Sequence, residues 1–275
     1  MERGWAGLGT DWDEHLLVAL EAAKEGANVL AHFAGKIETG DVDRKRAFDY
    51  VTQADVQSER AIISVIQSNF PDHSIFAEES EKEEGAYRWI IDPLDGTTNF
   101  VHGYPVYAIS IALEHKGEIV VGVVLDPTRS EYYYAVRGGG AYCNGRRISV
   151  SRIADPSLGL LTTGFPFRAK EHIDLYLRCF KKLFLTFSDV RRAGAVALDF
   201  AQLASGHCEG FWEIGLSPWD IAAGSLLIRE AGGRITDFGG GDRYIWTGNV
   251  VASNGIFHET ILETVRGIFA GTIDA

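Results

Sequence analysis

An apolar run that leads directly into two carboxylates and a glycine-threonine-threonine segment constrains this chain more than any other stretch. It reads Trp89-Ile90-Ile91-Asp92-Pro93-Leu94-Asp95-Gly96-Thr97-Thr98-Asn99-Phe100. The three apolar residues at its start predict a buried strand, and Asp92-Pro93-Leu94-Asp95 has the residue order of a type I turn. We therefore predict that the chain turns sharply at the end of this strand and holds Asp92 and Asp95 close together.

The chemistry of this turn suits a metal ion next to a phosphate. Two neighbouring carboxylates repel each other unless a proton or a cation lies between them, and hard oxygen ligands of this kind favour Mg²⁺. Gly96 lets the backbone approach a ligand, while Thr97 and Thr98 are good residues to begin a helix, whose free N–H groups bind anions. Because such a cluster costs stability unless something binds there, we interpret the segment as functional.

Length and charge limit the class of protein. At 275 residues, the chain is long enough for one large α/β unit or for two closely packed domains. No stretch reaches the roughly eighteen consecutive apolar residues of a membrane span, and acidic residues stand where a signal peptide is basic and then apolar. We expect a cytoplasmic protein without membrane contact. The formal charge of −12 makes a nucleic-acid partner unlikely, because phosphate backbones are bound by basic patches.

Residues 1–150 are expected to form an α+β half. Helical spacing of apolar residues predicts helices over about 13–33 and 52–70, and the second begins with a capping box formed by Thr52 and Asp55. The polar segment 35–50 between them is expected to be a mobile loop. A strand is expected over 74–77. Short β-rich runs separated by turn signals then predict an antiparallel meander over 109–113, 119–125 and 132–136, with a hairpin at Asn144-Gly145.

Residues 151–275 are expected to form an α/β half, because strands and helices alternate there. Strands are predicted over 158–163 and 210–213 and near 235 and 250, and helices over about 173–184, 196–205, 218–231 and 257–268. No low-complexity linker separates the two parts, which predicts a tight boundary near Ser151. We expect the first half to carry most metal ligands and the second to complete the site.

Four acidic elements lie at the ends of predicted strands and helices, where catalytic ligands concentrate. They are Asp55, Glu78-Glu79, the pair Asp92 and Asp95, and Asp220 in Ser217-Pro218-Trp219-Asp220. Taken singly, Asp55 is typical of a helix cap, Glu78 of a solvated acidic loop, and Asp220 of a residue that complements a helix dipole. Taken together, they can surround two or more Mg²⁺ ions that activate water and bind phosphate, which predicts hydrolysis of a phosphate monoester.

With these motifs in this order, the sequence resembles the inositol monophosphatase family of Mg²⁺-dependent, lithium-sensitive sugar phosphatases. The motifs are Val51-Thr52-Gln53-Ala54-Asp55, Ala77-Glu78-Glu79-Ser80, the segment from Trp89 to Gly103, and Trp219-Asp220-Ile221-Ala222-Ala223-Gly224 followed by Glu230-Ala231-Gly232-Gly233. The resemblance covers nearly the whole chain. It implies a layered αβαβα sandwich of the sugar phosphatase type, a homodimer and a phosphorylated small-molecule substrate.

The resemblance also implies which residues hold the metal ions. A first Mg²⁺ would be held by Glu78, Asp92 and the backbone carbonyl of Leu94. A second would be held by Asp92, Asp95 and Asp220, and a third, weaker ion would lie near Glu78. Two or three Mg²⁺ ions per site are therefore expected.

The same resemblance implies the catalytic and substrate-binding residues. Thr97, oriented by Asp55, would help to deprotonate the attacking water, and Glu78 would be the third catalytic residue. The N–H groups of Gly96 and Thr97 would bind the phosphate at the helix N-terminus. The substrate's sugar would be contacted by Asp95, Gly194, Ala195, Glu213 and Asp220.

One position departs from the family pattern in a way that bears on the substrate, and another is ambiguous. Ala193-Gly194-Ala195-Val196 replaces hydroxyl-bearing residues that many relatives carry, which changes the expected contacts to inositol. In the segment before the second helix, Arg44, Lys45 and Arg46 are equal candidates for the basic residue that relatives place near the site.

Three functions remain open from the sequence. The leading one is hydrolysis of inositol 1-phosphate or a similar polyol or sugar monophosphate. The first alternative is fructose 1,6-bisphosphatase or dual activity on the same scaffold, where Arg168, Lys170, Arg191 and Arg192 are candidates to bind the second phosphate. The second alternative belongs to another class, a regulatory module that binds protein or RNA and in which catalysis is incidental.

Overall fold

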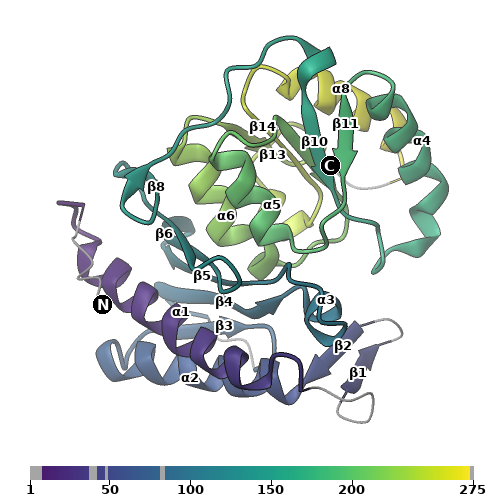
Figure 1. Cartoon of the computed structure of the whole chain (residues 1–275). Coiled ribbons are helices and arrows are strands. Elements are labelled where there is room, and N and C mark those ends of the chain that lie inside the picture. Colours follow the sequence, from purple (N-terminus) through teal and green to yellow (C-terminus); the bar gives the residue numbers. More distant parts are fainter. Residues whose placement is uncertain (1–7, 37–41, 47–48, 81–83, 273–275) are drawn as a thin grey trace.

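The computed structural model of the chain describes residues 8–36, 42–46, 49–80 and 84–272. Within these residues, a seven-stranded and a five-stranded β-sheet alternate with three helical layers (Figure 1). Helices α1 (Asp13–Phe33) and α2 (Gln53–Asn69) cover the outer face of the larger sheet, α5 (Val196–Ala204) and α6 (Pro218–Glu230) lie between the sheets, and α4 (Ile173–Phe184) and α8 (His258–Phe269) cover the smaller sheet. The predicted αβαβα sandwich is confirmed.

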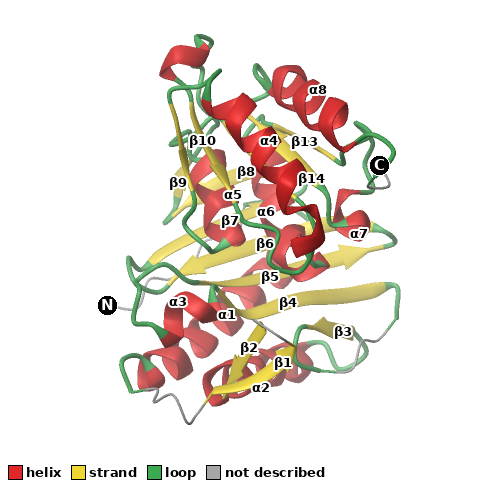
Figure 2. Cartoon of the chain, turned by 90° about the vertical axis from the view of Figure 1, so that its right-hand side faces the viewer, coloured by secondary structure: helices red, strands yellow, loops and turns green. Residues whose placement is uncertain are grey.

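The larger sheet contains the predicted meander. Its strand order is β3 (Ser74–Ala77), β4 (Tyr87–Asp95), β5 (Ala108–His115), β6 (Glu118–Asp126), β7 (Glu131–Val136), β8 (Gly140–Cys143) and β9 (Arg146–Arg147). Only β3 pairs in parallel with its neighbour β4, and the other pairs are antiparallel. Strands β5 and β6 are buried on both faces because helices cover both sides of the sheet (Figure 2).

The smaller sheet is mixed. Its order is β11 (Asp189–Arg191), β10 (Leu160–Thr163), β12 (Gly210–Glu213), β14 (Val250–Ser253) and β13 (Arg234–Thr236), with β10 parallel to both β11 and β12. Strand β11 and the short helix α7 (Tyr244–Thr247) were not predicted, because three or four residues are too few to show a period. The division into halves at residue 150 stays a prediction.

The segment before α2 differs from the prediction. Instead of one mobile loop, β1 (Val42–Arg46) and β2 (Asp49–Thr52) form an antiparallel hairpin in which Val42 lies opposite Thr52. The sequence did not indicate these strands because their residues are mostly charged and show no apolar alternation. A two-stranded ribbon needs no such alternation, since its strands are joined by backbone hydrogen bonds. Arg44, Lys45 and Arg46 lie in β1, and their side chains fall outside what the structure describes, as do residues 37–41 and 47–48.

Helix α6 packs unusually close to the larger sheet, and this contact sets the position of the acidic residue in its first turn, Asp220. A methyl group added to Gly122 of β6 would lie 2.7 Å from the carbonyl oxygen of Ala223 in α6. On the other side of the helix, a methyl group on Gly224 would lie 2.4 Å from the Phe200 side chain of α5. Both approaches therefore need glycine. No helix in the described ranges is long and apolar enough to cross a bilayer.

Substituting Gly122→Ala is expected to lower the free energy of unfolding by about 1–3 kcal/mol, because the methyl group forces α6 away from β6. Gly267→Ala is the matched control: this glycine lies in α8 with no atom within 4 Å of an added methyl group. There alanine should stabilise by up to about 1 kcal/mol through its helix propensity. Urea unfolding measures both, and an unchanged stability of Gly122→Ala would contradict the close packing.

Candidate active site

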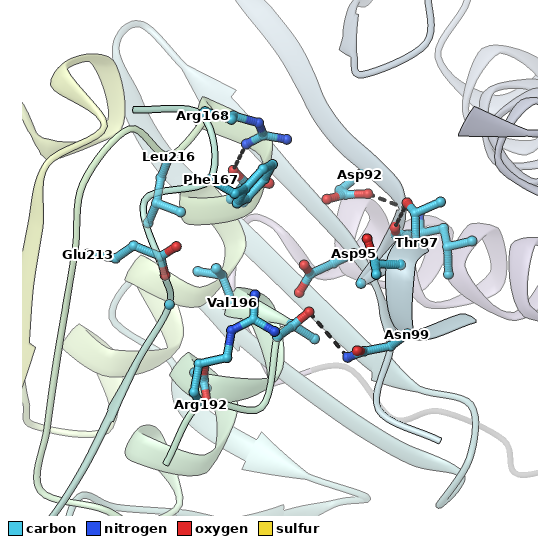
Figure 3. Close-up of a pocket in the computed structure, with 18 of the residues that line it drawn as sticks. Asp92, Asp95, Thr97, Asn99, Phe167, Arg168, Arg192, Val196, Glu213 and Leu216 are labelled. Atoms are coloured by element: carbon cyan, nitrogen blue, oxygen red, sulfur yellow. Dashed lines mark hydrogen bonds and ion pairs between the residues drawn. The ribbon is translucent and has the colours of Figure 1, made fainter. Parts of the chain in front are cut away.

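A cavity of about 330 Å³ lies where the end of β4 meets the ends of α5, α6 and β12 (Figure 3). Ten of the residues predicted to act at the site line it together: Glu78, Asp92, Leu94, Asp95, Gly96, Thr97, Gly194, Ala195, Glu213 and Asp220. The remaining one, Asp55, lies behind the wall and contacts the hydroxyl of Thr97. The structure therefore gathers around one space residues that are as far apart in the sequence as Glu78 and Asp220, 142 positions.

A β-bulge in β4 places the carboxylates of Asp92 and Asp95 on the same face of the strand. A type I turn was predicted at this position. Strand β4 continues to Asp95, and its residues 92–95 lie opposite only 108–110 of β5, so β4 has one extra residue there. In a regular strand, residues three apart point to opposite faces, and one extra residue corrects this. The backbone N–H of Leu94 donates to Asp92 Oδ1 at 2.9 Å and fixes the irregular segment.

Three carboxylates form a close cluster in the cavity. Asp92, Asp95 and Asp220 each offer an oxygen within 4.8 Å of the others, and all three side chains are buried. Burial, followed by the charges of Glu78, Asp95 and Asp220, raises the pKa of Asp92 well above its usual range. Burial and the charge of Asp220 raise the pKa of Asp95 to about 7. Such an all-oxygen set of repelling charges fits a hard divalent cation.

Asp220 comes from the first turn of α6. Pro218 occupies the first helical turn, and Asp220 forms a capping box with Ser217, whose backbone N–H donates to Asp220 Oδ2 at 2.7 Å. The same oxygen accepts from Arg168 Nη1 at 2.9 Å. Burial raises the pKa of Asp220, and the Arg168 guanidinium opposes that rise. Glu78 lines the cavity from the end of β3, where its N–H donates to Ile91 O at 3.2 Å.

Thr97 lies at the start of α3 (Thr97–Val101) with its hydroxyl between two acceptors. Its Oγ1 lies 3.1 Å from Asp55 Oδ1 and 3.0 Å from Leu94 O. The other oxygen of Asp55 accepts from the N–H of Thr52 at 2.8 Å in the predicted capping box. Asp55 is therefore a helix cap and a partner of Thr97 at once. Gly96 precedes the helix with φ of 89°, a conformation that favours glycine.

The opposite wall presents a buried carboxylate. Glu213 ends β12, and its Oε2 is buried without a hydrogen-bond partner among the described residues. Burial, followed by the charge of Asp199, raises the pKa of Glu213 well above its usual range. Gly164 leaves room for it, because a methyl group there would lie 2.1 Å from Glu213 Oε1. A buried acceptor without a donor is uncommon, so Glu213 suits a ligand that brings hydroxyl groups.

Two functional features were missed in the sequence. Asn99 joins the two walls, since its Nδ2 donates to Val106 O at 2.8 Å and Ala193 O at 3.0 Å. Asp199 lines the cavity, and burial together with Asp95 raises its pKa well above the usual range. A lone carboxylate in the otherwise apolar first turns of α5 was the available signal for Asp199. Nothing local indicates the long-range contacts of Asn99.

The four basic residues suggested for a second phosphate are not all gathered at the cavity. Arg168 and Arg192 line it. Arg191 is exposed and pairs with Asp189, and Lys170 does not belong to the cavity lining. Arg192 lies over the Phe165 ring, with 5.6 Å between its guanidinium carbon and the ring centroid.

The repulsion in the cluster predicts that Asp95→Asn stabilises the protein when divalent cations are chelated. The ordinary pKa of an aspartate is 3.8 and that of Asp95 in the fold is about 7, so ionised Asp95 opposes folding fully above pH 7 and not below about pH 4. Asparagine keeps the acceptor for the Ala197 N–H at 2.7 Å. We expect a gain of about 1–4 kcal/mol at pH 8 that shrinks toward pH 4, measured by urea unfolding in chelator. A loss of stability at pH 8 would contradict it.

Known proteins resemble this chain in sequence and in fold. The model of the inositol monophosphatase family matches residues 11–269. Over 254 residues, the chain is 44% identical to the protein named Nus factor SuhB of Escherichia coli (strain K12), covering 91% of this chain and 95% of that protein. The crystal structure of extragenic suppressor protein suhB from Bartonella henselae has a TM-score of 0.88 and 38% identity, covering 92% of this chain and 98% of that one.

Inositol monophosphatase from Anabaena (Nostoc) has a TM-score of 0.84 and 38% identity, covering 94% of this chain and 97% of that one. The name Nus factor gives no support to the expectation that a nucleic-acid partner is unlikely. The family model covers nearly the whole chain, and the relatives match it almost end to end. This chain belongs to the inositol monophosphatase family.

Proposed function

We propose that this protein is a Mg²⁺-dependent phosphate monoester hydrolase that acts on inositol 1-phosphate or a similar polyol or sugar monophosphate. The observation that carries the proposal is the buried cluster of Asp92, Asp95 and Asp220 beside the N-terminus of α3. Repelling carboxylates favour a divalent cation, and a helix start next to them favours an anion. A phosphate ester is a substrate that suits both.

Two or three Mg²⁺ ions are proposed per site, held by Glu78, Asp92, Asp95, Asp220 and the carbonyl of Leu94. When bound, such ions offset the phosphate charge and lower the pKa of a water molecule. The geometry that supports this set is the 4.8 Å cluster of three carboxylates with Glu78 and Leu94 in the same cavity wall.

Thr97, Asp55 and Glu78 are proposed as the catalytic residues. The Thr97 hydroxyl donates to Asp55 Oδ1 at 3.1 Å, which leaves its oxygen lone pairs directed away from the carboxylate and able to accept a proton from the attacking water. Thr97 Oγ1 takes a proton from the water as it passes its own proton to Asp55 Oδ1, so that the water becomes hydroxide and Asp55 becomes a carboxylic acid. Glu78 lines the same cavity and would help to orient the water.

The substrate is proposed to lie between α3 and the wall formed by α5 and β12. The N–H groups of Gly96 and Thr97 would bind the phosphate, and Asp220 would face the leaving oxygen. Asp95, Gly194, Ala195 and Glu213 would face the hydroxyl groups of the sugar. The unpartnered Glu213 Oε2 supports a polyol in particular, because each hydroxyl can supply the missing donor.

Two alternatives have one supporting observation each. The guanidinium groups of Arg168 and Arg192 in the cavity favour a second phosphate, as in fructose 1,6-bisphosphate. The name Nus factor, carried by relatives 44% identical to this chain, favours a regulatory role with a protein or RNA partner. If that role is the principal one, Asp95→Asn will leave it unaffected in the cell while phosphatase activity is lost.

We also propose a homodimer and inhibition by lithium, both on the family resemblance. Exposed apolar side chains on α4, namely Ile173, Leu177 and Phe184, support a protein contact at that surface. Sedimentation equilibrium tests the homodimer: the wild-type chain should be dimeric and Leu177→Glu should weaken the dimer. A monomeric wild type would reject the dimer.

Phosphate release tests the proposed reaction. We expect Mg²⁺-dependent turnover that favours inositol 1-phosphate over fructose 1,6-bisphosphate, histidinol phosphate and a nucleotide bisphosphate, and that stops with chelator. Asp95→Asn should lower kcat/KM about a hundredfold or more, since it removes both a metal and a substrate contact. Asp155→Asn is the matched control, because Asp155 is an exposed cap where asparagine serves equally. No turnover on any ester would reject the proposal.

Replacing the Thr97 hydroxyl tests its role in proton transfer. Thr97→Val keeps the side-chain shape and should lower kcat about 10²–10⁴-fold with little change in KM. Thr97→Ser keeps the hydroxyl and should retain activity within about tenfold. Steady-state kinetics measures both variants, and a Val variant as active as the Ser variant would show that the hydroxyl carries no proton.

A further inference from the structure

An arginine that the sequence suggested only as a ligand of a second phosphate reaches into the carboxylate cluster. Arg168 lies between β10 and the short 3₁₀ turn Lys170–His172, and its Nη1 donates to Asp220 Oδ2 at 2.9 Å and to Ser217 Oγ at 3.3 Å. Its Nη2 lies 4.0 Å from Glu78 Oε1. Figure 3 shows a dashed line from the Arg168 guanidinium to a carboxylate oxygen below it. One fixed positive charge therefore spans two of the acidic groups proposed as metal ligands.

This charge acts on the same groups as a metal ion would. The cluster attracts a cation because three carboxylates share one buried space. A guanidinium bound to one of them offsets part of that negative charge and repels a second cation across a space of low dielectric constant. It also engages Asp220 Oδ2, which already accepts the Ser217 N–H at 2.7 Å. A metal ion must therefore share Asp220 with Arg168 or displace it.

The contacts of the Arg168 side chain are made by the guanidinium group at its end. Its side chain is 24% exposed, and its guanidinium carbon lies 4.8 Å from the centroid of the Phe167 ring. Because the side chain is partly exposed and contacts the ring of the adjacent Phe167, the guanidinium can leave Asp220 and keep its contact with Phe167. By contrast, Arg192 lies on the other side of the cavity over Phe165, and its charge opposes the rise in the pKa of Asp199 and Glu213 that burial causes.

We propose that Arg168 is an internal cation that competes with the metal ion held by Asp92, Asp95 and Asp220. It compensates the carboxylates when that ion is absent and weakens the ion's binding when it is present, so that this ion exchanges readily. The inference rests on the proposed metal-dependent function. It assigns Arg168 to control of metal occupancy and not to recognition of a second phosphate.

Cation titration without substrate tests the competition. Binding of Mn²⁺, followed by electron paramagnetic resonance, and of Mg²⁺, followed by calorimetry, is compared for the wild-type chain, Arg168→Gln and Arg168→Lys. Removing the charge in Arg168→Gln should tighten cation binding about tenfold, a coupling of ordinary size between two ligands of one site. Arg168→Lys keeps the charge and should stay within about threefold of the wild type.

Two control variants distinguish the direct contact between Arg168 and Asp220 from the effect of any positive charge in or near the cavity. Arg192→Gln removes a charge from the same cavity without removing a bond to the cluster, and it should change the affinity by less than Arg168→Gln does. Arg191→Gln removes an exposed charge paired with Asp189 and should change nothing. An equal effect of Arg168→Gln and Arg192→Gln would overturn the specific competition.

Thermal unfolding gives an independent measurement. In chelator, Arg168→Gln should melt below the wild type, because Asp220 loses its counter-charge, and saturating Mg²⁺ should raise its Tm by more than it raises that of the wild type. Unchanged or weaker cation binding in Arg168→Gln would overturn the inference and leave Arg168 as a residue that orients Asp220. Absence of cation binding in the wild type would instead overturn the proposed function on which the inference rests.

Discussion

Mutual repulsion among three buried carboxylates is the constraint on which the site depends. Asp92, Asp95 and Asp220 offer oxygens within 4.8 Å of one another, and burial and the charges of neighbouring carboxylates, Glu78 among them, raise their pKa values. A fold that holds such a group together does so against an electrostatic cost that the rest of the structure must offset. The two apolar sheets and the central helices supply that stability, and a cation or the Arg168 guanidinium reduces the cost locally.

Helix caps orient two carboxylates of the site, those of Asp55 and Asp220. Asp55 in α2 and Asp220 in α6 are both the third residue of their helix and form a capping box with the cap residue. In each, Oδ2 accepts the N–H of the cap residue, Thr52 at 2.8 Å or Ser217 at 2.7 Å. At Asp55 the other oxygen faces Thr97 at 3.1 Å. A residue that anchors a helix start with one oxygen can thus serve a site with the other, and a structural role does not compete with a catalytic one.

The sequence was sufficient for much of the fold because long periodic segments determine it. The apolar spacing of 13–33 and the alternating runs after residue 108 each have enough residues to establish a period, and their bounds agree closely with α1 and with β5 to β7. Strands β1 and β11 escaped because they are short and charged. The bulge at Asp92 escaped because Asp-Pro chemistry indicates a turn, while the pairing of β4 with β5 that continues the strand is a tertiary effect.

The candidate site was predictable where its residues belong to ordered motifs, as for Asp92, Asp95, Thr97 and Asp220. It was not predictable where a contact joins distant segments. The bond between Arg168 and Asp220 spans 52 positions, and that between Asn99 and Ala193 spans 94. That Glu213 Oε2 has no hydrogen-bond partner among the described residues is a property of the assembled cavity, so no local pattern around β12 could indicate it.

Proton release on cation binding tests the central claim most directly. If the cluster is held by repelling carboxylates with raised pKa values, some of them are protonated near neutral pH in the cation-free protein, and a bound divalent cation must displace those protons. Calorimetric titration with Mg²⁺ in buffers of different ionisation enthalpy measures the number released. The account predicts proton release at pH 6.5, where Asp95 with a pKa of about 7 is mostly protonated, and less release at pH 9, where Asp95 is ionised before the cation binds. Binding without proton release at pH 6.5, or no binding at all, would contradict it.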